Sequence, residues 1–239
     1  MNAGIDTFSA GSQRIRMNSH RKTSLVAGLL YILTFISIPT LGLYRPLHQP
    51  GYLIRPGTDD AVILGGILEI IVALAGIATA VVLYPVLKKQ NQTLALGLVT
   101  SRVLEASTIF VGVAFILTAV TLHQNRSGLD GVATSRALVS LYDRIFLLGQ
   151  SFMPAVNDVL LGVLLYKSRL VPRALSLIGI VGSAPLIAGY LAVMFGLIEQ
   201  RSTLAGLAAV MVALFEFLLG VYLIIKGFKQ SPAIIQSNH

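Results

Sequence analysis

Five ionisable side chains lie in stretches that are otherwise apolar enough to cross a membrane: Glu69, Arg102, Glu105, Asp158 and Glu216. An ionisable group in the hydrocarbon of a bilayer costs about 3 kcal/mol on insertion scales, so such groups usually pair or line a site. Buried carboxylates can bind a cation or relay a proton, and a guanidinium can neutralise them. These five side chains are therefore the main candidates for chemistry in this sequence.

The composition explains why these charges stand out. The 239 residues are 55% hydrophobic and only 12% charged, whereas soluble domains carry about 25% charged residues. The deficit and the long apolar runs indicate a polytopic membrane protein. Cysteine is absent, which excludes disulfides and thiolate metal sites. The net charge of +8 does not indicate nucleic-acid binding, because the basic residues lie in short loops and tails, without an aromatic groove pattern.

Six apolar segments reach the length of about 20 residues that a helix needs to cross a bilayer. They are expected at residues 23–44, 61–87, 94–122, 145–166, 172–198 and 204–225. The sequence predicts an all-α bundle of six transmembrane helices over residues 23–228, between a polar basic tail, 1–22, and a short tail, 229–239. The first segment is interpreted as a retained helix, because it is long and lacks a small-residue cleavage site.

The basic residues predict the orientation of this bundle. Eleven Lys and Arg residues belong to the tails and loops on one side, and six belong to the loops on the other side. Cytoplasmic loops carry the excess of basic residues in membrane proteins, so both termini are expected in the cytoplasm. The fourth helix is expected to begin near Val132 and to project beyond the outer interface, because apolar residues follow helical spacing there.

Four of the five buried charges are expected to form one cluster: Arg102, Glu105, Asp158 and Glu216. Counted at 1.5 Å per residue from the cytoplasmic flanks, all four lie about 12–17 Å from the inner edge. Arg102 and Glu105 share a helix face, and the guanidinium can reach a second carboxylate. One arginine cannot neutralise three carboxylates, so at least one of these is expected to hold a proton at neutral pH. Glu69 is expected nearer the outer face.

Small residues recur at helical spacing beside three of these charges. Those beside Glu216 are Ala205, Ala209, Ala213 and Gly220. Stripes of small residues let membrane helices approach closely. The charges are therefore expected on packing faces, directed away from lipid.

The fourth segment carries two neighbouring polar stripes. One contains Arg136, Asp143, Gln150 and Asn157 at intervals of seven residues, and the other contains Arg144, Ser151 and Asp158. Seven residues drift by only about 20° on an ideal helix, so both stripes follow one side. Pro154 interrupts them and predicts a kink. Either these side chains line a cavity, with Asp143, Gln150, Ser151 and Asn157 as candidates, or they hold the helix to its neighbours.

Motifs of established chemistry are missing from the sequence. All four histidines lie in predicted tails or loops, so no haem or metal site is expected, and no cofactor is predicted. There is no Glu-x-x-His pair, H-E-x-x-H, Walker A or G-x-S-x-G sequence. Ser151 and Ser183 lie in predicted spans without a nearby histidine, so serine–histidine catalysis is unsupported.

Several segments resemble a known family: LLYILTF at 29–35, LYPVL at 83–87, SRVLEA at 101–106, LYKSRLVPR at 165–173 and the C-terminal stretch 216–228. Together they resemble the bacterial membrane family catalogued as domain of unknown function 4386, over about residues 21–228. The resemblance implies a multi-pass protein of a bacterial inner membrane with six helices. It implies no activity, cofactor or catalytic residue.

Three functions are compatible with these residues. The first is a small-solute or proton-linked carrier with Glu105, Asp158 and Glu216 as binding or relay groups. The second is a non-catalytic membrane partner or sensor whose buried charges are structural. The third and least favoured is an intramembrane enzyme, which needs two carboxylates within reach of one water. The lipid bilayer is the expected partner, nucleic acid is not, and the residues specify neither a ligand nor an oligomeric state.

Overall fold

The structure is a computed structural model that describes residues 19–49, 52, 59–125 and 128–229. Over these residues the chain is helical and contains no strand. The α-helices are α1 (Ser19–Thr34), α2 (Thr40–Leu43), α3 (Asp59–Leu87), α4 (Gln92–Gln124), α5 (Gly128–Phe146), α6 (Met153–Ser168), α7 (Arg173–Met194) and α8 (Thr203–Ile225). The predictions for the tails through residue 18 and from residue 230, and for loop residues Arg55 and Arg126, lie outside the described residues.

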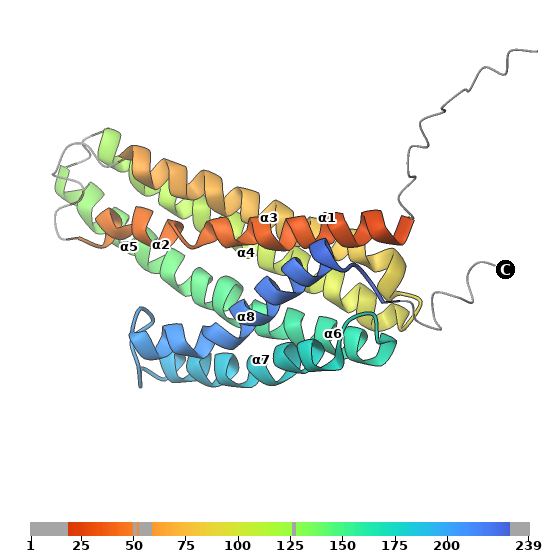
Figure 1. Cartoon of the computed structure of the whole chain (residues 1–239). Coiled ribbons are helices and arrows are strands. Elements are labelled where there is room, and N and C mark those ends of the chain that lie inside the picture. The colour runs from red at the N-terminus through yellow and green to blue at the C-terminus, as the bar shows by residue number, and fades with distance from the viewer. Residues whose placement is uncertain (1–18, 50–51, 53–58, 126–127, 230–239) are drawn as a thin grey trace, which may run out of the picture.

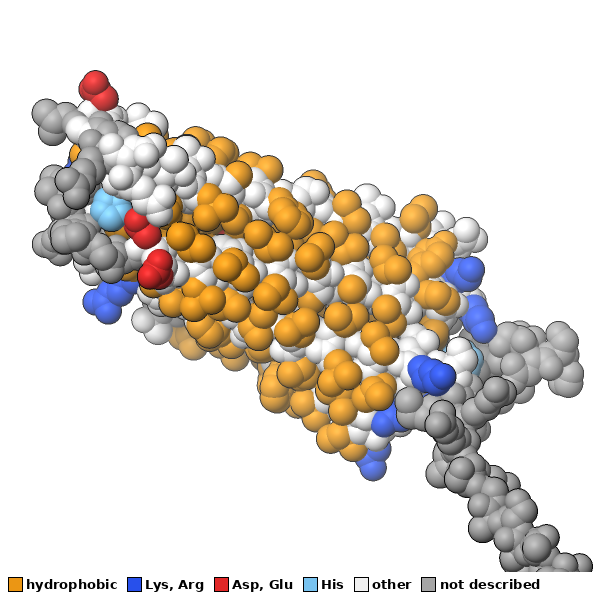
Figure 2. Space-filling view, turned by 90° about the horizontal axis from the view of Figure 1, so that it is seen from above, with side chains coloured by type: hydrophobic (Ala, Val, Ile, Leu, Met, Phe, Trp, Pro, Cys, Tyr) orange, Lys and Arg blue, Asp and Glu red, His pale blue; other side chains and the backbone are white. Residues whose placement is uncertain are grey.

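Five described helical stretches are long and apolar enough to cross a membrane. They are α3, α4, α7, α8 and the stretch Asp130–Ser168, which contains most of α5 and all of α6. An α-helix rises about 1.5 Å per residue, so the 29 residues of α3 exceed the roughly 30 Å of a hydrocarbon core. Figure 2 shows hydrophobic side chains along the visible face, and Lys and Arg at its two ends. These helices are those of a multi-pass membrane protein.

The first predicted span is divided. Helix α1 has only 16 residues, and it is followed by the 3₁₀ turn η1 (Phe35–Ser37), α2 and the 3₁₀ turn η2 (Arg45–His48). The expectation of one helix over residues 23–44 is therefore wrong. Pro39 explains the break, because proline has no backbone N–H to donate to the preceding turn of a helix. Figure 1 shows α1 and α2 one after the other beside α3.

Two of the longer helices begin with side-chain caps, at Asn91 and Ser202. The side chain of Asn91 accepts a hydrogen bond from the Leu94 N–H at 2.9 Å at the start of α4, and Ser202 accepts from the Ala205 N–H at 3.3 Å at the start of α8. Both satisfy backbone donors that a helix start leaves unpaired. Arg169 ends α6 in the left-handed conformation, with φ of 55°.

Helices α1 and α8 cross closely near the end of the bundle where both described chain ends lie (Figure 1). A Cβ atom on Gly28 would lie 2.7 Å from the Gly220 carbonyl oxygen, so only glycine fits this crossing. Arg21 donates to the carbonyl oxygens of Leu223 and Ile224 at the end of α8. Away from this crossing, α7 and α8 diverge from α1 and α2 (Figure 1).

The opposite end is tied together by side chains from the first loop. The Tyr52 hydroxyl donates to Asp59 Oδ1 at 2.7 Å, and His123 Nδ1 lies 2.6 Å from the same oxygen. The Tyr52 and His123 rings are 4.7 Å apart between centroids. Burial raises the pKa of Tyr52, and its contact with Asp59 raises it further. These contacts join the first loop to the start of α3 and the end of α4.

Candidate functional site

Arg102 is the centre of a buried ionic cluster. It lies on α4 and is only 4% exposed. Its Nη1 donates to Glu105 Oε2 at 3.0 Å, one turn along the same helix, and its Nη2 donates to Glu216 Oε1 on α8. A guanidinium can form such paired bonds to two carboxylates because its donors are held in a rigid fork. The structure therefore joins three of the four residues of the expected cluster.

Asn157 connects α6 to the same cluster. Its Nδ2 donates to Glu105 Oε2 at 2.7 Å, and its Oδ1 accepts from Ser101 Oγ at 2.6 Å. The Asn157 side chain is fully buried, and both ends of its amide are hydrogen bonded. Burying an amide without such partners would cost about 1–3 kcal/mol. These bonds fix the position of Glu105 from a second helix.

Asp158 lies next to the cluster and forms no hydrogen bond with it. The residue is 0% exposed, and neither of its carboxyl oxygens has a hydrogen-bond partner among the described residues. Glu216, Arg102 and Glu105 are near enough to interact with it electrostatically. A buried polar group without a partner is costly, and an ionisable group of this kind inside a membrane is a functional candidate by default.

A cavity of about 590 Å³ begins at the ionic cluster. Small-molecule sites in proteins have volumes of about 300–1,000 Å³. One end is lined by Arg102, Glu105 and Glu216. The other end is lined by Asp143, near the end of α5, and by Gln200 and Arg201 in the loop before α8. Between the two ends the walls are mainly apolar and include Phe35, Ile109, Phe146, Leu147, Leu186, Tyr190, Val193 and Val212.

The polar stripes of the fourth predicted segment are divided between the cavity and the packing behind it. Asp143, Gln150 and Ser151 line the cavity, whereas Asn157 does not and is buried against α4. Gln150 and Ser151 belong to a π-helical turn, η4 (Leu147–Phe152), which separates α5 from α6. This turn comes immediately before Pro154, which has no N–H to donate to the previous turn. Single π turns within α-helices occur frequently at functional sites.

The small residues of α8 are also divided between two roles. Gly220 packs against α1, where a Cβ atom would lie 3.0–3.2 Å from Tyr31, Ile32 and Gly28. Ala205, Ala209 and Ala213 instead line the cavity. The part of the stripe from Ala205 to Ala213 therefore faces the cavity, because α8 diverges there from α1 (Figure 1).

Glu69 occupies a separate polar cluster behind the cavity wall. It is 1% exposed and does not line the cavity. The Tyr142 hydroxyl donates to Oε1 at 2.7 Å, Gln150 Nε2 donates to the same oxygen at 3.1 Å, and the Tyr44 hydroxyl donates to Oε2 at 3.2 Å. Gly65 allows this arrangement, because a Cβ atom there would lie 2.6 Å from the Tyr44 ring.

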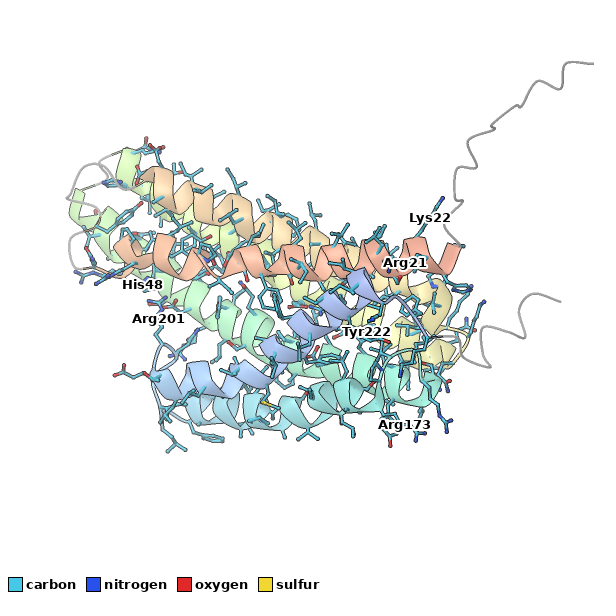
Figure 3. The ribbon with its side chains drawn as sticks, in the orientation of Figure 1. Arg21, Lys22, His48, Arg173, Arg201 and Tyr222 are labelled. Atoms are coloured by element: carbon cyan, nitrogen blue, oxygen red, sulfur yellow. The ribbon has the colours of Figure 1, made fainter. Side chains whose placement is uncertain are left out.

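The end of the cavity opposite the ionic cluster is crossed by a polar latch of His48, Asp143 and Arg201. Arg201 Nη2 lies 2.8 Å from Asp143 Oδ1, and His48 Nε2 lies 3.2 Å from the same oxygen. Gln200 Nε2 donates to the Asp143 carbonyl oxygen at 3.0 Å. Figure 3 shows His48 and Arg201 near each other at the end opposite Arg21 and Arg173. The latch therefore connects the loop before α8 with α5 and η2.

Residues 26–227 match the family described as "Domain of unknown function (DUF4386)". The chain belongs to the DUF4386 family. This agrees with the resemblance of the segments from 29–35 to 216–228. No curated protein and no solved structure matches the chain. The family places the chain among proteins defined by shared sequence rather than by an assigned activity.

Several residues of this DUF4386 chain join the site without a sequence signal of their own. Ser101 could have been inferred only from its position next to Arg102 in the sequence. Arg201 and His48 lie in connecting segments, where no periodic pattern predicts their contact. Tyr31 on α1 lies beside Arg102, with the guanidinium carbon 5.9 Å from the ring centroid. Over the described residues, no group of three or more His, Asp or Glu side chains is arranged to hold a metal ion.

Proposed function

We propose that this protein is a carrier that binds a small solute in the cavity, with the Arg102–Glu105–Glu216 cluster as its binding floor. The observation that carries the proposal is the continuity of the lining from Asp143 and Arg201 to this buried ionic cluster. A buried ion pair that served only packing would not need a cavity of ligand size beside it. Small-molecule sites combine apolar walls with a few convergent polar groups, as this cavity does.

We also propose that the chain crosses a bacterial inner membrane six times with both termini in the cytoplasm. The first crossing would consist of α1, η1 and α2 together. Support comes from the line that α1 and α2 follow beside α3 (Figure 1), and from the place of both described chain ends at one end of the bundle. The excess of basic residues on that side favours the cytoplasm. In this arrangement the latch faces outward.

Asp158 would serve the carrier as a proton site behind the binding floor. It is enclosed, has no hydrogen-bond partner among the described residues, and lies near enough to Glu216 for the two carboxyl groups to interact electrostatically. A proton on Asp158 would alter the charge felt by a solute at Glu216 without contact between the two. Proton-linked membrane carriers use intramembrane carboxyl groups in this way.

Single cysteines test whether the cavity opens to water. The chain has no native cysteine, so Ala209→Cys would place one thiol in the cavity lining. Ala27→Cys is the matched control, because Ala27 is 0% exposed and does not line the cavity. A membrane-impermeant methanethiosulfonate is added to one face at a time of sealed vesicles with known orientation. Reaction at a buried position requires local opening, so Ala209→Cys should react at least about tenfold faster than the control.

The sidedness of the reaction separates the two leading functions. A carrier exposes its site to either face in turn, so Ala209→Cys should react from the outer face and, more slowly, from the inner face. Reaction from the outer face alone would contradict transport and favour a receptor or sensor. Absence of reaction from both faces would contradict a solute-accessible cavity.

The second candidate function is a membrane partner or sensor in which the cluster is structural. One observation favours it: Arg102 ties α4 to α8 while Asn157 ties α6 to α4. In that case Asp158→Asn would preserve function and Arg102→Ala would cause misassembly. A carrier that uses Asp158 for protons would instead lose its dependence on a pH gradient in Asp158→Asn, measured as solute uptake into proteoliposomes.

A further inference from the structure

The floor of the cavity offers unused hydrogen-bond acceptors. Glu105 Oε2 accepts from Arg102 and Asn157, and Glu216 Oε1 accepts from Arg102. The other oxygen of each carboxylate, Glu105 Oε1 and Glu216 Oε2, forms no hydrogen bond with a described residue. The two side chains are 12% and 15% exposed and line the cavity. An ionised carboxylate can only accept hydrogen bonds, so both can still bind a donor.

The donors of Arg102 at the floor are either engaged with carboxylates or buried. Both Nη atoms of Arg102 donate to carboxylates, and its Nε is buried without a partner. The Arg102 side chain is only 5% exposed. An anionic solute would have to displace a carboxylate from the guanidinium to reach it. The floor that a cationic solute would reach carries two carboxylates and one guanidinium. Its net charge is therefore negative even when Asp158 is neutral.

The walls above the floor suit an apolar body with a positive head. Aromatic side chains from η1, α5 and α7 line the cavity: Phe35, Tyr142, Phe146 and Tyr190. Such walls suit the apolar body of a solute whose charged group lies at the floor. The second arginine in the lining, Arg201, lies at the outer end and pairs with Asp143. Positive charge is therefore neutralised both at the outer end and at the floor.

We infer that the cavity selects a small organic cation: a protonated amine held between Glu105 and Glu216, with an apolar body along the aromatic walls. This inference rests on the proposed solute-binding function and adds the chemical class of the solute. The amine donates to the two unused carboxylate oxygens, while Arg102 keeps the carboxylates in place. The cavity volume of about 590 Å³ accommodates a molecule of drug-like size or smaller.

Three probes of matched shape test the charge preference: 4-phenylbutylamine, 4-phenylbutanol and 4-phenylbutyrate. Their dissociation constants are measured on the purified full-length protein in a non-ionic detergent by equilibrium dialysis, with protein-free detergent as the reference for partitioning. Charge-assisted hydrogen bonds to a carboxylate should make the amine bind at least about tenfold tighter than the alcohol. The anion should bind more weakly than the alcohol.

Two variants locate the preference at the floor. Glu216→Gln and Glu105→Gln should each reduce amine affinity about tenfold and leave alcohol affinity within about twofold. Glu199→Gln is the matched control, because Glu199 is an exposed loop residue that does not line the cavity, and it should leave all three affinities unchanged. If Glu216→Gln fails to fold, Glu105→Gln and the wild-type series still decide the question.

The outcomes separate this inference from the function on which it rests. Equal binding of amine and alcohol, or tightest binding of the anion, would overturn the cation preference and leave solute binding intact. A tenfold preference for the amine that persists in both floor variants would overturn the assignment to Glu105 and Glu216. Lack of binding by all three probes, together with unreactive Ala209→Cys, would overturn the proposed function itself.

Discussion

Glu69 and Glu216 are both glutamates buried in apolar helices, yet their surroundings differ. Glu69 accepts hydrogen bonds from two tyrosines and one glutamine and lies behind the cavity wall. Glu216 pairs with Arg102 and lines the cavity, and its other oxygen has no hydrogen-bond partner in the described part of the chain. The comparison shows that burial of a charge does not define a binding site. Unused acceptors that face a cavity make Glu216 the candidate for binding a ligand, whereas the neutral donors around Glu69 are consistent with a structural role.

The largest expected effect is the loss of the cation that holds the floor together. Arg102→Ala leaves Glu105 and Glu216 without their shared partner and removes the link between α4 and α8. Breaking a buried ion pair by removing one member costs about 3–5 kcal/mol. The free energy of unfolding in detergent, followed by loss of helical circular dichroism, should fall by that amount. Arg136→Ala, on an exposed position of α5, is the control and should have little effect.

The second effect concerns the saturated glutamate. Glu69→Ala leaves the hydroxyls of Tyr44 and Tyr142 and the Gln150 amide without their acceptor, which should lower the free energy of unfolding by about 2–4 kcal/mol. Glu69→Gln retains an acceptor oxygen and should lose less. Neither variant should change the preference for amine over alcohol. A loss of that preference in Glu69→Gln would show that the two clusters act as one site and would break the comparison.

Much of the fold and part of the site follow from the sequence. The length of apolar runs predicts α3, α4, α7 and α8, because hydrocarbon thickness sets helix length. The spacing of Arg102 and Glu105 predicts their ion pair, because residues three apart share a helix face. Counting residues from the basic flanks also places Glu216 at the same depth as Arg102, because the rise per residue of an α-helix is nearly constant.

The rest depends on how helices tilt and diverge, which no local pattern records. Ala209 and Gly220 belong to the same stripe of small residues around Glu216 in the sequence. Ala209 nevertheless lines the cavity, whereas Gly220 packs on α1. Asn157 and Asp158 are neighbours in sequence, and among the residues that the structure describes only Asn157 has side-chain hydrogen-bond partners. The contact of His48 with Arg201 spans connecting segments without periodic structure. These features need the assembled bundle.

A third prediction separates the closed part of α8 from its open part. Gly28→Ala places a methyl group 2.7 Å from the Gly220 carbonyl oxygen, and such overpacking should cost about 2 kcal/mol. Gly206→Ala is the same change at a cavity-lining position with no atom within 4 Å of the new Cβ. It should alter the free energy of unfolding by less than about 1 kcal/mol, since alanine favours helix. Equal costs would contradict the division of α8 into packed and open parts.

The smallest effect on stability is expected at the latch, where the effect on access should be clearest. Arg201 is half exposed and bridges to Asp143, so Arg201→Ala should lower the free energy of unfolding by less than about 1 kcal/mol, as for other exposed ion pairs. Without this bridge the loop before α8 loses a tie to α5, and Ala209→Cys should react faster from the outer face. Glu199→Ala, in the same loop but without a bridge to α5, should leave the rate unchanged. If Arg201→Ala also leaves it unchanged, the latch holds helices together without controlling entry, and its role would match that of the Glu69 cluster.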